Sequence, residues 1–415
     1  MSLLIPVYGV DEVVEVPLDA LPDDANDLID VLTGETATLD VWLQCALAYY
    51  AAGRPAQGQL VLRESCEIKE DIFPDAKAER VSLLLALAGH SLNAALAIPD
   101  RRERKKLLDD AAQLFTRADA VDLSDARIKL GRGFLHLHDG TDATDPSRAR
   151  RAFEQALLER PAEPLAVLGL AVCHFVHGGY ADALRLFRQL LTSCAQPPAG
   201  VRLGLGLCYA QLKQPALARA CFERALQLEP QNADAAYALA LELTHDATDA
   251  HSVREGVRRL AALHRVEPAN PHVLNQLANH FFYARDYAKV EQFARQAYQA
   301  ATSSRSRAES YWHLARNQHA KEAWAGARQF YSEAAKIAPN FVLAQYGVGL
   351  MHARAGELEA ALAPLRTTAR AHPAAPEPLR VLARVLLEAG RLDEAARALE
   401  QLVALDESDP CLLYT

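Results

Sequence analysis

Residues 199–232 read AGVRLGLGLCYAQLKQPALARACFERALQLEPQN, two amphipathic segments separated by a polar break that ends in a proline. The first segment carries the small residue Gly206, and the second carries Ala218 four positions before Phe222. Small residues allow two helix backbones to approach closely, and large apolar side chains fill the space between successive turns. The stretch therefore predicts two packed antiparallel helices, with Pro230 closing the unit.

The small residue of the second segment recurs along the chain. After a first gap of 53 residues, the spacing is 34 to 38 residues, and nine of ten positions hold Gly or Ala. A two-helix unit of about 34 residues is typical of the tetratricopeptide repeat (TPR). We therefore expect an all-α, right-handed α-solenoid of about ten TPR helix pairs. The ten positions are Gly58, Ala111, Ala149, Ala183, Ala218, Gly256, Val290, Ala327, Ala361 and Ala395.

The repeat does not cover the ends of the chain. Residues 1–38 lack it and are interpreted as a short N-terminal arm or cap, with an extended segment near Val16 and a short helix over 24–32. Residues 39–409 are expected to form the TPR superhelix. Residues 410–415 match the start of a further, truncated repeat, which indicates a truncated chain or an end covered by a partner.

Composition narrows the function. The chain has 415 residues, 50% of them hydrophobic, with a formal net charge of −9. Such a composition supports a large core and gives no broad positive field, so we expect no direct nucleic-acid partner. No apolar run reaches the length of a membrane span. The cysteines Cys45, Cys173, Cys208 and Cys221 fall on apolar helical faces and are interpreted as reduced core residues.

Motifs of catalysis are missing from the sequence. The chain contains no HExxH, GxxxxGK[ST], GxSxG or complete GxGxxG pattern. We therefore expect no catalytic residues, no metal site, no cofactor and no enzymatic activity.

TPR stacks bind protein segments along the face formed by their first helices. In the first half of the chain this face is predicted to be apolar, with some of its positions shared with the core. In the second half it is polar and aromatic, and two asparagines four residues apart could clamp a peptide backbone or bond between repeats. The candidate partner-binding residues are Leu43, Leu47, Tyr50, Leu168, Val172, Phe175, Leu203, Leu207, Asn275 and Asn279.

Three stretches resemble one TPR family: DEVVEV at 11–16, VRLGLG at 201–206 and LANHFF at 277–282. The last is the most specific, because generic repeats do not require it. The chain is similar to the large TPR subunits of the RNA polymerase II-associated factor (Paf) complex, the Cln-three-requiring-nine family. The family's members are longer than this chain.

This resemblance implies a nuclear, non-catalytic scaffold that supports transcription elongation and co-transcriptional histone modification. It implies protein partners: the namesake subunit of the Paf complex, the parafibromin-like subunit and, indirectly, RNA polymerase II. No membrane partner is expected. Two alternatives are the TPR targeting module of a larger, glycosyltransferase-like enzyme and a co-chaperone adaptor. The first lacks its asparagine ladder, since the ladder position holds Gly204, Ala238, Gln276 and His313; the second lacks its cations.

Overall fold

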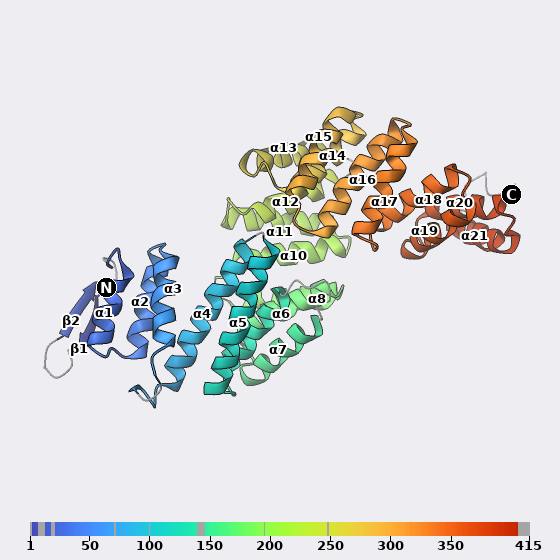
Figure 1. Ribbon diagram of the computed structural model, residues 1–415. Helices are drawn as coiled ribbons and strands as arrows, with labels where there is room; N and C mark the ends of the chain where they lie inside the picture. The colour runs from blue at the N-terminus through green and yellow to red at the C-terminus, as the bar shows by residue number, and fades with distance from the viewer. Residues whose placement is uncertain are drawn as a thin grey trace. The chain divides into compact units, whose positions relative to one another are not determined.

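The computed structural model describes residues 2–6, 13–17, 21–69, 72–98, 100–138, 146–194, 196–246 and 249–405. The chain divides into two compact units, Met1–Ala225 and Leu226–Thr415, and the boundary falls inside one helix (Figure 1). Outside a small N-terminal hairpin, all regular elements of the described residues are helices. The expected truncated repeat at 410–415 lies outside the described residues.

Helices of the first unit follow one another in antiparallel pairs after a single arm helix. The arm helix is α1 (Ala25–Gly34). The pairs are α2 (Leu39–Ala51) with α3 (Pro55–Cys66), α4 (Lys77–Ala97) with α5 (Arg101–Val121), α6 (Ala126–His138) with α7 (Pro146–Glu159), α8 (Pro164–Val176) with α9 (Tyr180–Ser193), and α10 (Ala199–Gln211) with α11 (Pro215–Leu228), the helix that crosses the boundary.

Five further pairs make up the second unit. They are α12 (Ala233–Thr244) with α13 (Ala250–Val266), α14 (Pro271–Tyr283) with α15 (Tyr287–Ala300), α16 (Ser304–Ala320) with α17 (Trp324–Ile337), α18 (Val342–Arg354) with α19 (Leu358–Ala371), and α20 (Pro376–Glu388) with α21 (Leu392–Leu405). The prediction of about ten helix pairs is confirmed for the described residues.

The small residues at the repeat positions lie where the paired helices cross. Ala149, Ala183, Ala218 and Ala327 have no exposed surface. A Cβ added to Gly58 would stand 3.0 Å from the Ala46 carbonyl oxygen of the preceding helix, so only a small residue fits there. Val290, the one departure from Gly or Ala, is also fully buried. The repeat spacing thus reflects the close approach of two helices in each pair.

The N-terminal arm packs on the first helix pair. Strands β1 (Ser2–Pro6) and β2 (Val13–Pro17) form an antiparallel hairpin, of which the sequence predicted only the second strand. In the adjoining segment, the Tyr49 hydroxyl donates to the Pro22 carbonyl at 3.0 Å, and Leu28 and Leu32 are buried in the same cluster as Trp42. The arm thus contacts both helices of this pair, since α1 also touches α3.

Two other expectations concerned a membrane-spanning segment and the cysteines. By length and composition, α4 is apolar enough to cross a membrane, so the expectation that no such segment exists was wrong. Its buried residues, including Val81 and Leu84, belong to the core of the first unit. Cys45, Cys173 and Cys208 are buried, and burial raises the pKa of each thiol to about 11; Cys221 is half-buried.

Candidate protein-binding grooves

The first helices of successive pairs contact one another in each unit. In the first unit, each first helix contacts the next one along the row α2, α4, α6, α8 and α10. In the second unit, the corresponding row is α14, α16, α18 and α20. We call the surface formed by these rows the first-helix face. In TPR stacks this face binds partner segments.

In the first unit, the predicted apolar residues of the first-helix face are only partly used by the core. Leu47 is 51% exposed. Leu43, Leu168, Val172 and Phe175 are half-buried and pack against buried clusters with one side, and Leu203 and Leu207 are also half-buried. These residues come from α2, α8 and α10, so they supply separate apolar contacts along the row rather than one pocket.

Tyr50 has a stronger structural role than the others. Its ring lies 5.5 Å from the His90 ring on α4, and a Cβ on Gly58 of α3 would stand 2.9 Å from it. Burial raises the pKa of its hydroxyl to about 12, and that hydroxyl has no hydrogen-bond partner. Tyr50 therefore fills the junction of three helices.

Two exposed residues of α8 were missed at the sequence level. Leu165 is 50% exposed and Val176 is 62% exposed. Leu165 precedes Leu168 by three positions, and Val176 follows Val172 by four, so both continue the same helical face. Extending that spacing to the ends of the helix would have found them.

In the second unit, Asn275 corrects one part of the prediction. It is fully buried between α14 and α16. Its Nδ2 donates to the Ser306 carbonyl at 3.4 Å, and the Ser310 hydroxyl donates to its Oδ1 at 3.0 Å. The asparagine therefore joins two repeats and does not present its amide to a peptide, because a buried amide needs internal partners.

Asn279 takes part in a different arrangement, which centres on Arg316 of α16. Nη2 of Arg316 donates to Asn279 Oδ1 at 2.7 Å. The guanidinium carbon lies 4.1 Å from the Phe282 ring centre and 4.4 Å from that of Trp312. Aromatic faces attract a cation in this geometry. We call Asn279, Phe282, Trp312 and Arg316 the arginine cluster.

A half-buried acid, Glu309, and a buried histidine, His313, lie beside the arginine cluster on α16. The His313 Nε2 atom is 4.0 Å from Glu309 Oε1. Burial lowers the pKa of His313 well below its usual value and raises the pKa of Glu309. Neither ring nitrogen of His313 has a hydrogen-bond partner. Sequence reasoning named neither residue as a binding candidate, because their burial depends on the contact between repeats.

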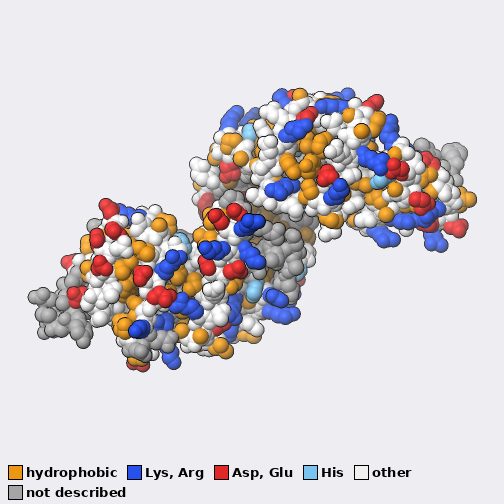
Figure 2. Space-filling model, viewed as in Figure 1, with side chains coloured by type: hydrophobic (Ala, Val, Ile, Leu, Met, Phe, Trp, Pro, Cys, Tyr) orange, Lys and Arg blue, Asp and Glu red, His pale blue; other side chains and the backbone are white. Residues whose placement is uncertain are grey.

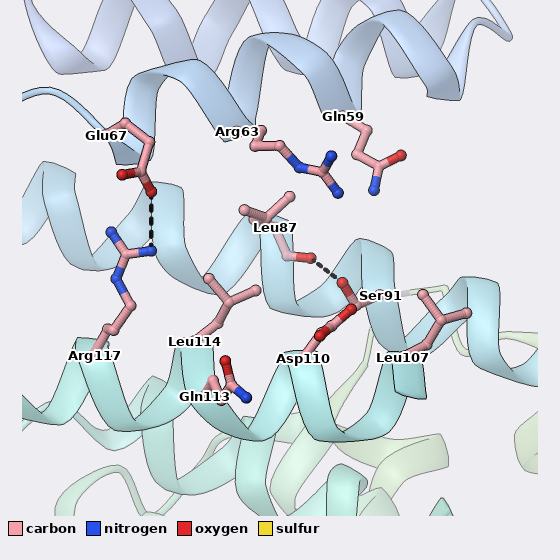
Figure 3. Close-up of a pocket in the computed structure, with 10 residues that line it drawn as sticks. All are labelled: Gln59, Arg63, Glu67, Leu87, Ser91, Leu107, Asp110, Gln113, Leu114 and Arg117. Carbon is pink, nitrogen blue, oxygen red and sulfur yellow. Dashed lines mark hydrogen bonds and ion pairs between the residues drawn. The ribbon is translucent and has the colours of Figure 1, made fainter. Parts of the chain in front are cut away.

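A cavity of about 300 Å³ lies between α3, α4 and α5 in the first unit. Figure 3 shows Gln59 and Arg63 of α3 above Ser91 of α4 and Asp110 of α5. The Arg117–Glu67 ion pair, at 3.2 Å, lies at one end, and the Ser91 hydroxyl donates to the Leu87 carbonyl at 3.2 Å. None of its ten lining residues is a His or Cys. The lining thus offers Ser91 no histidine base.

One surface region of the second unit is rich in hydrophobic side chains. In Figure 2, hydrophobic side chains gather over α14 to α16, with basic and acidic side chains around them. Within the described residues, no three His, Cys, Asp or Glu side chains are grouped so that they could hold a metal ion.

Comparisons with known proteins bear on the fold and on the family. Tetratricopeptide-repeat family models match residues 142–200, 200–232 and 352–410. The protein CTR9 homolog of Arabidopsis thaliana is 31% identical over 98% of this chain. The RNA polymerase-associated protein CTR9 of Caenorhabditis elegans is 26% identical over 85%, and that of Saccharomyces cerevisiae is 28% identical over 70%.

This chain is a CTR9-like tetratricopeptide-repeat protein. The resemblance inferred from the three sequence stretches is thereby confirmed. The chain spans 37% of the length of the Arabidopsis relative, 31% of the worm relative and 28% of the yeast relative. Among solved structures, a human IFIT1 dimer aligns over 92% of this chain and 84% of its own, with a TM-score of 0.53 and 18% identity. That likeness concerns the TPR solenoid fold alone.

Proposed function

We propose that this CTR9-like chain is a non-catalytic scaffold of the Paf transcription elongation complex. The observation that carries the proposal is the similarity to CTR9 proteins along nearly the whole chain, from the arm to the last repeats. Two of those relatives are named RNA polymerase-associated proteins. A scaffold needs rigid surfaces that bind segments of other proteins, which TPR stacks provide.

The first-helix face of the first unit is the proposed site for the namesake subunit. Leu47, Leu165 and Val176 expose apolar surface there, and Phe175, on the same helix as the last two, is half-buried. Exposed apolar groups on a row of first helices suit the apolar side chains of an extended or helical partner segment. The parafibromin-like subunit is a second proposed partner, and contact with RNA polymerase II is proposed to be indirect.

The proposal includes a nuclear location and a supporting role in elongation and co-transcriptional histone modification. Both follow from membership of the Paf complex. A targeting module of a glycosyltransferase-like enzyme and a co-chaperone adaptor stay as alternatives, and no contact in the described residues favours either of them.

The test is affinity purification from nuclear extract with residues 1–415 as bait, read by mass spectrometry. Recovery of the Paf-complex subunits is expected. Recovery of chaperones, or of an unrelated set of glycosylated proteins, without those subunits would refute the scaffold assignment. A second bait carries the Leu47→Glu substitution on the first-helix face. It should recover less of the Paf-complex subunits than the unaltered bait.

A further inference from the structure

The positive charge of Arg316 in the arginine cluster has no carboxylate bonded to it among the described residues. Arg316 is only 7% exposed, and burial lowers the pKa of its guanidinium to about 10. Its Nε has no hydrogen-bond partner. Among the described residues its hydrogen-bond partners are uncharged, the amide of Asn279 and the side chain of Tyr283, and it forms no ion pair with a carboxylate. A buried charge without a counter-charge is costly unless something else supplies one.

The nearest acid does not remove this deficit. Glu309 influences Arg316 electrostatically, but it is itself half-buried, and desolvation raises the pKa of its carboxyl group. Arg305 also acts on Glu309 and holds its guanidinium 4.3 Å from the Phe341 ring. Two arginines therefore share one acid in this part of the groove, and His313 is neutral because burial lowers its pKa.

The geometry around Arg316 suits a planar anion. The guanidinium lies over the rings of Phe282 and Trp312, and Asn279 accepts a hydrogen bond from one of its nitrogens. Nε of Arg316 is the guanidinium nitrogen without a hydrogen-bond partner, so a ligand that bonds the arginine would do so along its N–H edge. Carboxylates bind that edge through two parallel hydrogen bonds, which a lysine or a neutral amide does not reproduce.

The position along the first-helix face indicates the type of carboxylate. Arg316 stands on α16, and the row continues on both sides, through α14 in one direction and α18 in the other. An extended segment lying on this row would pass Arg316 with chain on either side. An internal Asp or Glu side chain fits that path better than a chain terminus.

We propose that the arginine cluster is a receptor for an Asp or Glu side chain within an extended segment of a partner protein. The inference rests on the proposal that the first-helix face binds protein segments, and it adds the chemistry of one such segment. The first-helix face of the first unit recognises apolar side chains, whereas that of the second unit recognises an acidic one.

The test is selection from a random 16-residue peptide library displayed between two Gly-Ser linkers, with the full 415-residue chain as target. Clones that also bind the Arg316→Met variant are removed. Synthetic copies of enriched peptides are then measured with acidic residues intact or replaced by Asn or Gln. The matched control is Arg295→Met, which removes the same charge from an exposed site on α15. Melting curves establish that both variants are folded.

The expected result is enrichment of one Asp or Glu position. Its replacement by the amide should weaken binding to the wild-type chain about 10- to 100-fold, as removal of a charged hydrogen-bond partner does. Binding to Arg316→Met should be equally weak for both peptides, and Arg295→Met should behave as wild type. Because the amide peptide is tested on the unaltered chain, this comparison does not depend on any variant.

Three outcomes would overturn the inference. They are the absence of enriched peptides, enrichment without an acidic position, and equal affinity for the acidic and amide peptides. Binding only by peptides with a free C-terminal carboxylate would also overturn it, in favour of a chain terminus. If Paf-complex subunits are still recovered from nuclear extract, only this inference fails and the scaffold proposal stands.

Discussion

Phe222 of α11 lies so close to Gly206 of α10 that a Cβ added to the glycine would stand 2.3 Å from the ring's Cε1 atom. The ring is almost completely buried. A similar contact joins Phe153 of α7 to Gly169 of α8, and Phe187 of α9 to Gly204 of α10, in each case between one helix pair and the next. Close contact between a glycine and an aromatic ring thus recurs in the first unit, and it explains why large side chains are absent at these positions.

Replacing Gly206 with Ala is expected to destabilise the chain. The added methyl group cannot fit unless Phe222 or a backbone moves, and such overpacking costs about 1–3 kcal/mol. Gly200→Ala is the matched control, because it lies on the same helix with no atom within 4 Å of the added Cβ. Urea denaturation should show a lower midpoint for Gly206→Ala and an unchanged or higher one for Gly200→Ala. Equal midpoints would contradict the packing described.

Substitution of Asn275 is expected to lower stability, whereas substitution of Asn279 is expected to change peptide binding. Asn275→Ala removes a buried amide that bonds Ser306 and Ser310, so the free energy of unfolding should fall by about 1–3 kcal/mol. Asn279→Ala leaves the core intact and frees the edge of Arg316, so it should change affinity for acidic peptides more than stability. Thermal melts and peptide titrations measure the two effects. A larger stability loss for Asn279→Ala would show that the two roles are reversed.

His313 is expected to make stability depend on pH. Burial lowers its pKa in the folded state well below the usual value, so the unfolded chain binds the proton first as pH falls. Unfolding should therefore become easier as pH decreases below about 6.5, the usual histidine pKa. The raised pKa of Glu309 acts in the opposite direction, because the folded state takes up that proton first.

The free energy of unfolding of wild type and of each variant is measured by chemical denaturation between pH 7.5 and pH 5.5. His313→Gln should reduce the loss of stability at low pH. His372→Gln, at an exposed position, is the matched control and should leave the loss unchanged. If both variants follow the wild-type curve, His313 is not the group that takes up the proton on unfolding.

Repeat spacing was enough to predict the helix pairs, because one small residue per pair must lie at the helix crossing. It placed Ala218 and Ala327 correctly and tolerated Val290, which is also buried. Strand β1 could not be predicted from the repeat spacing, because it pairs with β2 in a hairpin that lies outside the repeats. The apolar character of α4 was underestimated because polar residues such as His90, Ser91 and Asn93 interrupt its apolar run.

Prediction of the grooves was less complete for a physical reason. First-helix positions can face a partner or the next repeat, and spacing alone does not separate these two environments. Asn275 and Asn279 are four residues apart on one helix, yet one is inside the core and the other bonds Arg316. The cluster around Arg316 depends on contacts between α14 and α16, which a single helix does not encode.

The most direct test measures binding of the purified namesake subunit of the Paf complex to residues 1–415 by titration calorimetry. Leu47→Glu combined with Leu165→Glu places charges on two exposed residues of the first-helix face in the first unit. Leu158→Glu, on the second helix of a pair and 83% exposed, is the matched control. We predict that wild type and Leu158→Glu bind equally and that the double variant does not bind. Unchanged binding by a folded double variant would contradict the groove assignment.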